Sequence, residues 1–199
     1  MHRNKGFKSA LFITSVLLFS ATTLTSCLHI PKDPNPGQIV ENDVLPEGHK
    51  VCVIGDSGKK NEGQRIVADI LRKEGCHQVR HTGDIIYSDG IDSADDPEFI
   101  ERFHNYYADM YEKDGVPFYM SQGNHDYRKI PEAWLELANR YEGIKFPSMY
   151  YMDVYKDICF ITIDTNSRPI RQYKWMKNLK MDYGEKCKLT LAFGCLLYT

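Results

Sequence analysis

The chain has 199 residues, a length typical of one domain, and carries 25 lysine and arginine residues against 27 aspartate and glutamate residues. Its 42% apolar content excludes a disordered chain, and its formal net charge of −2 excludes a strongly basic nucleic-acid-binding protein. Residues 1–26 hold three basic residues and no acidic one, so residues 27–199 carry a formal charge of −5. A body with this charge has no electrostatic attraction to nucleic acid or to an anionic membrane surface.

The first 26 residues have the pattern of a secretory signal peptide. A short basic stretch precedes an apolar run at 10–21, which is too short for a membrane span of about 20 residues. The tetrapeptide Leu24-Thr25-Ser26-Cys27 that follows resembles a bacterial lipobox, whose cysteine is lipidated and becomes the mature N-terminus. The alternative is a plain signal peptide followed by an incidental cysteine. We therefore expect an exported lipoprotein of the bacterial cell envelope, periplasmic or on the outer surface, held at the membrane only through the lipid on Cys27.

Residues 31–37 contain three prolines and a glycine, which predict an extended tether that cannot be helical. The expected organisation is a signal peptide at 1–26, a tether at 27–48 and a folded domain at 49–199. Cysteines follow Cys27 at positions 52, 76, 159, 187 and 195, an odd number with irregular spacing. Two of them, Cys52 and Cys159, lie in apolar strand-like runs where a free thiol packs as a small hydrophobe. The sequence therefore predicts no functional disulfide.

Strands and helices alternate along the body. We expect strands at 50–54, 78–82 and 117–121, helices at 63–74, 97–113 and 131–141, a hairpin at 149–153 and 158–164, a helix at 172–179 and a strand at 189–193. The apolar face of the first helix comprises Ile66, Val67, Ile70 and Leu71, and Gly75 ends that helix. This alternation predicts an α/β fold with a parallel sheet covered by helices.

A polar loop follows each of the first three expected strands. These loops read Gly55-Asp56-Ser57-Gly58, Gly83-Asp84-x-x-Tyr87 and Gly123-Asn124-His125-Asp126. Ligands of open α/β sheets bind beyond the carboxyl ends of the strands, so the three loops are expected to converge. A single Gly-Asp pair is common in turns, but three such loops on successive strands are far more specific. Together they resemble the calcineurin-like metallophosphoesterases, and within them the purple acid phosphatase branch, over roughly residues 50–194.

This resemblance implies a four-layer α/β/β/α sandwich that hydrolyses phosphate monoesters by attack of a metal-bound hydroxide. The implied cofactors are two metal ions, Fe(III) together with Fe(II), Mn(II) or Zn(II), and the implied partner is a phosphate ester substrate. By the same resemblance Asp56 ligates the first metal, Asp84 bridges both metals and Asn124 ligates the second. Tyr87 would be a phenolate ligand of the first metal, which favours Fe(III).

The third loop carries two further candidates. The resemblance implies that His125 binds the phosphate or protonates the leaving oxygen without binding metal. We expect Asp126 to orient His125 rather than to bind metal itself. Four basic residues flank the loops and either attract phosphate or simply form solvated surface: Lys59, Lys60, Arg128 and Lys129.

The resemblance is incomplete in the C-terminal part of the chain. The family's site also takes histidines from its C-terminal half, whereas no histidine of this sequence follows His125. Cys195 stands where the first of these ligands is expected, and a soft thiolate suits neither Fe(III) nor Mn(II). We therefore expect a truncated or frameshifted chain with an incomplete C-terminal part and impaired activity. The alternatives are a non-catalytic lipoprotein that binds phosphate or a partner, and a metallophosphodiesterase, which would usually lack Tyr87.

Overall fold

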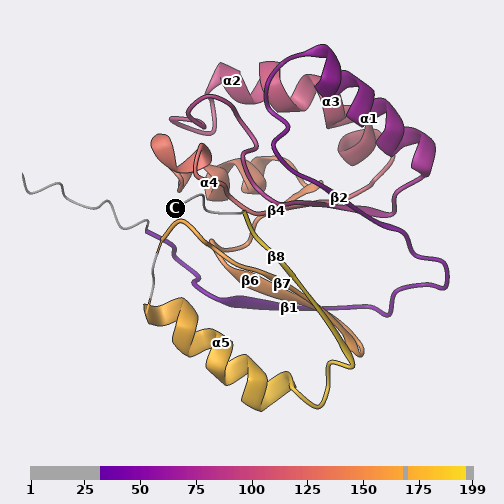
Figure 1. The fold of residues 1–199 in the computed structure, drawn as a ribbon, viewed down its shortest axis with the longest axis vertical. Helices are drawn as coiled ribbons and strands as arrows, with labels where there is room; N and C mark the ends of the chain where they lie inside the picture. The colour runs from indigo at the N-terminus through magenta and orange to yellow at the C-terminus, as the bar shows by residue number, and fades with distance from the viewer. Residues whose placement is uncertain (1–31, 168–169, 196–199) are drawn as a thin grey trace, which may run out of the picture.

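The computed structural model describes residues 32–167 and 170–195, which form two four-stranded sheets stacked face to face. Helices cover the outer side of each sheet, so the layers run α/β/β/α, as Figure 1 shows. This arrangement confirms the expected fold class. The expected signal peptide and the lipidation site Cys27 lie outside the described residues. Within the described part of the chain, no helix is both long enough and apolar enough to span a bilayer.

The first sheet is parallel throughout and carries the three polar loops. Its order is β2 (Val51–Ile54), β3 (Gln78–His81), β4 (Phe118–Met120) and β5 (Ile144–Lys145). The connections are α1 (Glu62–Glu74), a helical segment from α2 (Pro97–Phe99) through α3 (Asn105–Ala108), and α4 (Ala133–Arg140). Two π-helical turns, Ile100–His104 and Asp109–Lys113, complete the middle segment. Apart from β5, each of these elements was expected from the sequence.

Capping groups and turn residues fix where α1 begins and ends. The side chain of Asn61 accepts a hydrogen bond from the Gln64 N–H at the first turn of the helix. At the other end Gly75 adopts a left-handed φ of 63°, a conformation that glycine enters without a side-chain clash. The chain then turns directly into β3, so α1 forms a short crossover between two neighbouring parallel strands.

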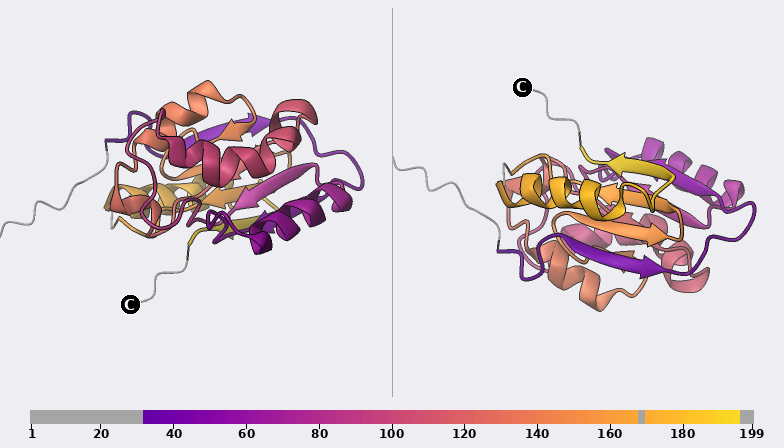
Figure 2. Two further views of the ribbon diagram at one scale, coloured as in Figure 1. Left: turned by 90° about the horizontal axis from the view of Figure 1, so that it is seen from above. Right: turned by 90° about the horizontal axis from the view of Figure 1, so that it is seen from below.

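The second sheet is mixed and has the order β1 (Gln38–Asn42), β6 (Tyr151–Tyr155), β7 (Ile158–Thr162) and β8 (Leu189–Phe193). Strands β6 and β7 form the expected antiparallel hairpin, and α5 (Ile170–Tyr183) covers the outer face (Figure 2). Strand β1, which pairs in parallel with β6, comes from the stretch expected to be a tether. Residues ahead of it are also attached to the body, since the Asp33 carboxylate accepts hydrogen bonds of 2.8 Å from Ser148 and Met149. The folded part therefore starts before residue 49.

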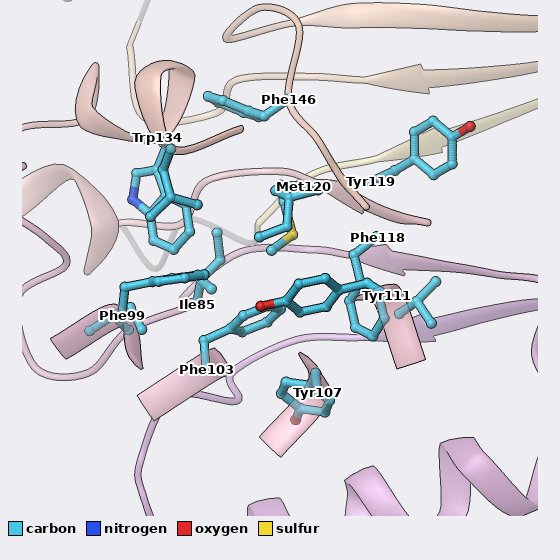
Figure 3. Packing of buried hydrophobic residues seen from close by; sticks show 14 of the residues in the cluster. Ile85, Phe99, Phe103, Tyr107, Tyr111, Phe118, Tyr119, Met120, Trp134 and Phe146 are labelled. Atoms are coloured by element: carbon cyan, nitrogen blue, oxygen red, sulfur yellow. The ribbon is translucent and has the colours of Figure 1, made fainter. Parts of the chain in front are cut away.

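An aromatic cluster fills the space between the first sheet and its helices, as Figure 3 shows. The side chains of Phe103, Tyr107 and Phe118 have no exposed surface, and Trp134 of α4 closes one side of the cluster. The buried face of α1 differs from the face that the apolar periodicity of its sequence predicts. Its buried residues are Gln64, Ala68 and Leu71. Only part of the predicted apolar face therefore packs against the sheet. Three of its residues have side chains that are 39–50% exposed: Ile66, Val67 and Ile70.

A buried ion pair joins the two sheets. Arg80 of β3 donates a 2.6 Å hydrogen bond to Asp153 of β6, and both side chains are at most 2% exposed. The guanidinium carbon also lies 3.7 Å from the ring centre of Tyr119 and 4.4 Å from that of Phe160. Burial raises the pKa of Asp153, and the adjacent guanidinium opposes that rise. The pair therefore links β3 of the first sheet directly to β6 of the second.

The prediction that the chain has no disulfide is wrong. Cys52 bonds to Cys76 and Cys159 bonds to Cys187, with sequence separations of 24 and 28 residues. Each bond closes a strand–helix–strand crossover, because its two cysteines lie on, or just before, neighbouring parallel strands. Cys52 and Cys159 therefore lie in apolar strands as members of disulfides and not as free thiols. Cys195 is the one cysteine among the described residues that does not form a disulfide.

Candidate metal centre

The three polar loops meet at one edge of the first sheet, where β2, β3 and β4 end. Backbone hydrogen bonds join the first loop to the second: the Asp56 N–H donates to Gly83 O at 3.0 Å, and the Ser57 N–H donates to Asp84 O at 3.2 Å. Both aspartates have left-handed backbones, with φ of 55° at Asp56 and 53° at Asp84. A non-glycine residue rarely adopts this conformation, and the paired loops hold both carboxylates in it.

Oxygen atoms of three residues converge in front of these loops. The Tyr87 hydroxyl lies within hydrogen-bond distance of the Asp56 carboxylate and 2.9 Å from Oδ2 of Asp84. Burial raises the pKa of Tyr87, and the hydrogen bonds to the two carboxylates raise it further. The phenol therefore keeps its proton between the two carboxylates, at the position where a cation would favour the phenolate. Tyr87 thus contacts both predicted carboxylate ligands, and three of the four predicted metal ligands lie together.

The fourth predicted ligand, Asn124, lies between two residues that touch the Asp84 carboxylate. On one side, a Cβ added to Gly123 would approach Oδ1 of Asp84 to 2.1 Å, so only glycine fits there. On the other side, the His125 N–H donates to the same oxygen at 3.0 Å. The structure therefore brings the third loop, with Asn124 at its centre, against the predicted bridging carboxylate.

His125 lies beside the predicted phenolate ligand. Its ring centre is 4.3 Å from that of Tyr87, and its Nδ1 hydrogen-bonds the backbone carbonyl of Ser88. This contact implies that Nδ1 carries a proton, because a carbonyl oxygen only accepts hydrogen bonds. Nε2 then remains as the imidazole nitrogen that is available to a ligand.

The Asp126 carboxylate binds backbone N–H groups of the loops. We expected it to orient His125 instead. Its carboxylate accepts hydrogen bonds of 3.1 Å from the N–H groups of Ile85 and Ile86 and one of 2.8 Å from Gly123. The side chain is fully buried, and this burial raises its pKa to about 7 although the three donors oppose the shift. Asp126 therefore joins the second loop to the third.

His81 is a supporting residue that the sequence analysis did not identify. Its Nδ1 accepts a 3.2 Å hydrogen bond from the Gly83 N–H, so its proton is on Nε2, which lies 2.8 Å from Oγ of Ser57. One neutral imidazole thereby connects the first and second loops. Burial lowers the pKa of His81 to about 3, so the ring stays neutral near physiological pH. Its position three residues before Asp84 is the only signal that the sequence offers.

Cys195 contributes to the same edge from the second sheet. Its Cβ would lie 2.9 Å from a Cβ placed on Gly83, and its carbonyl accepts a 2.9 Å hydrogen bond from Thr165. Burial raises the pKa of its thiol, and the nearby Asp84 and Asp56 carboxylates raise it further. The thiol therefore keeps its proton beside the two carboxylates.

The donor chemistry of this edge suits hard metal ions. Asp56, Asp84, Tyr87 and Asn124 offer only oxygen atoms, which Fe(III) and Mn(II) prefer. No group of three or more His, Cys, Asp or Glu side chains is arranged to hold a metal among residues 32–167 and 170–195. A metal site here would therefore need the phenol oxygen of Tyr87 and the amide oxygen of Asn124 in addition to the two carboxylates.

The chain is similar in sequence to known phosphoesterases over most of its length. The family model described as calcineurin-like phosphoesterase matches residues 23–190. Purple acid phosphatase 4 of Arabidopsis thaliana is 46% identical over 102 residues, which are 48% of this chain and 30% of that protein. Tartrate-resistant acid phosphatase type 5 of Oryctolagus cuniculus is 28% identical over 85 residues, which are 43% of this chain and 26% of that protein. The chain thus matches less than a third of the length of these relatives.

A solved structure supports the architecture alone. The protein described as "GAP50 the anchor in the inner membrane complex of Plasmodium" superimposes with a TM-score of 0.54 at 20% identity. The superposition covers 73% of this chain and 54% of that one.

Proposed function

Since this chain belongs to the calcineurin-like phosphoesterase family, in its purple acid phosphatase-like branch, we propose that the whole protein hydrolyses phosphate monoesters at a two-metal site. The observation that carries the proposal is the convergence of the Asp56 and Asp84 carboxylates on the Tyr87 hydroxyl. Carboxylates of like charge are costly to bring together in a partly buried site, and cations between them offset that cost.

Each metal ligand has a distinct task in this proposal. Asp56 and Tyr87 would hold one metal, Asn124 would supply an amide oxygen to the other, and Asp84 would serve both. The pair, Fe(III) with Fe(II), Mn(II) or Zn(II), would provide a nucleophile from water near neutral pH and positive charge for the phosphoryl oxygens. The left-handed backbones of Asp56 and Asp84 help to direct the two carboxylates toward the Tyr87 hydroxyl, which favours a preorganised site.

In this proposal His125 protonates the leaving oxygen of the substrate. The Ser88 carbonyl holds the proton of its Nδ1, so Nε2 is free to carry a second proton to the leaving oxygen. The ring also lies against Tyr87, which places the imidazole beside the ligand cluster and not within it. Asp126 and His81 keep the loops together and do not contact the reacting atoms.

We also propose that the protein is an exported lipoprotein anchored through Cys27. The pattern of residues 1–27 supports this, and so do the two disulfides, which form and persist in oxidising compartments. No attachment other than the lipid is proposed, because the body is acidic.

The test is hydrolysis of p-nitrophenyl phosphate and bis(p-nitrophenyl) phosphate by the protein purified from its native host. The proposal predicts monoester hydrolysis that is lost in Asp84→Asn and retained in Asp182→Asn, an exposed carboxylate on α5. A preference for the diester would identify a phosphodiesterase. Phosphate binding without any hydrolysis would identify a binding protein, and either result would overturn the proposal.

A further inference from the structure

The basic side chains around the candidate metal centre differ in how they are neutralised. Three of the four that flank the loops have acidic partners: Lys60 with Glu101, Arg128 with Asp89, and Lys129 with Asp92 and Asp96. The fourth, Lys59, has no carboxylate partner among the residues that the structure describes. A cation whose charge is already balanced attracts an anionic ligand only weakly, so the four are not equivalent.

Lys59 is also held close to the predicted ligands. Its N–H donates a 2.7 Å hydrogen bond to the Ser57 carbonyl, which ties its backbone to the first loop. Its ammonium lies 4.6 Å from the centre of the Tyr87 ring, the same ring that His125 contacts. Lys60 has a left-handed φ of 54°, and its side chain bonds to Glu101 on the helical segment after the loop. The ammonium of Lys59 therefore lies beside a predicted metal ligand, whereas that of the adjacent Lys60 is paired with Glu101.

We propose that Lys59 binds the phosphoryl group of the substrate and favours a dianionic monoester over a monoanionic diester. This inference rests on the proposed function, because it concerns the same site. An unbalanced ammonium attracts a dianion twice as strongly as a monoanion at the same distance. Contact with the Tyr87 ring restrains a flexible side chain near the ligands, which lowers the conformational cost of binding.

The experiment compares Lys59→Gln with Lys60→Gln and with the conservative Lys59→Arg, all in the full-length protein at pH 7.5. The first measurement is binding of inorganic phosphate by isothermal titration calorimetry. The second is the KM for p-nitrophenyl phosphate and for bis(p-nitrophenyl) phosphate. We expect Lys59→Gln to weaken phosphate binding and to raise the monoester KM roughly fivefold, the size of effect typical of one partly exposed charge. The diester KM should change less.

The controls separate this inference from the proposed function. Lys60→Gln should stay within about twofold of the wild type because its charge is already paired, and Lys59→Arg should restore most of the affinity. If Lys59→Gln binds phosphate as Lys60→Gln does, or if monoester and diester KM rise equally, the role of Lys59 is refuted. If the wild type hydrolyses neither ester, the proposed function fails, and phosphate binding alone then decides the role of Lys59.

Discussion

Removing the two disulfides tests a feature of the fold that the sequence analysis did not anticipate. The paired variants are Cys52→Ala with Cys76→Ala and Cys159→Ala with Cys187→Ala. Each bond closes a crossover with a sequence separation of 24 or 28 residues. In the chain-entropy model, a loop of that length contributes about 3.5 kcal/mol to the free energy of unfolding. Domains are usually stable by about 5–15 kcal/mol, so losing both bonds removes a large part of the total.

The assay is urea unfolding followed by circular dichroism, with and without a reductant. Each paired variant should lose about 3.5 kcal/mol, and the reductant should destabilise the wild type by the sum of both. In a thermal scan each pair should lower Tm by roughly 7–14 °C. Cys195→Ala is the matched control, because Cys195 is not part of a disulfide and its loss should leave the response to reductant unchanged. If the wild type unfolds at the same urea concentration with and without reductant, the pairings are wrong.

Three further predictions concern the sheet interface, the buried imidazole and the anchor. Arg80→Met leaves Asp153 buried without its partner and should cost about 3–5 kcal/mol of unfolding free energy, whereas a loss below about 1 kcal/mol would contradict the buried pair. His81 has a folded pKa of about 3, below its unfolded value, so stability is lost as pH falls below about 6.5. Between pH 7 and pH 5 this loss should be about 2 kcal/mol and absent in His81→Phe; equal pH dependence in both proteins would refute it. Cys27→Ser should release the protein from membranes, and a variant that stays with the membrane fraction after a high-salt wash would refute the lipid anchor.

Strands and loops of the site could be predicted because local chemistry determines them. β2 and β4 are short apolar runs, and all three strands lead into a loop with a glycine followed by a polar residue. Parallel strands bring such loops to one edge of the sheet. Asp56, Asp84 and Tyr87 accordingly meet in the structure. Prediction was harder for β1, because Ile39 is 37% exposed and the strand gains its hydrogen bonds from β6, more than 100 residues away in the chain.

Features that depend on the relative placement of elements could not be read from the sequence. The pairing of Cys52 with Cys76 requires knowing that β2 and β3 are adjacent, and that of Cys159 with Cys187 requires the same for β7 and β8. The role of His81 depends on its contacts with Ser57 and Gly83 across two loops. Which face of α1 is buried likewise depends on how the helix is rotated about its axis against the sheet. Ile66 is apolar yet 49% exposed, so apolar residues alone do not predict that rotation.

The most direct test of the metal centre is a calorimetric titration of Mn(II) into metal-free protein. Wild-type protein should bind Mn(II) saturably, and Asp84→Asn should abolish that binding because it removes the carboxylate placed between the three loops. Asp89→Asn, an exposed acidic residue paired with Arg128 beside the site, should bind as the wild type does. Equal Mn(II) binding by the wild type and Asp84→Asn, or no binding by the wild type, would contradict a metal centre at these loops.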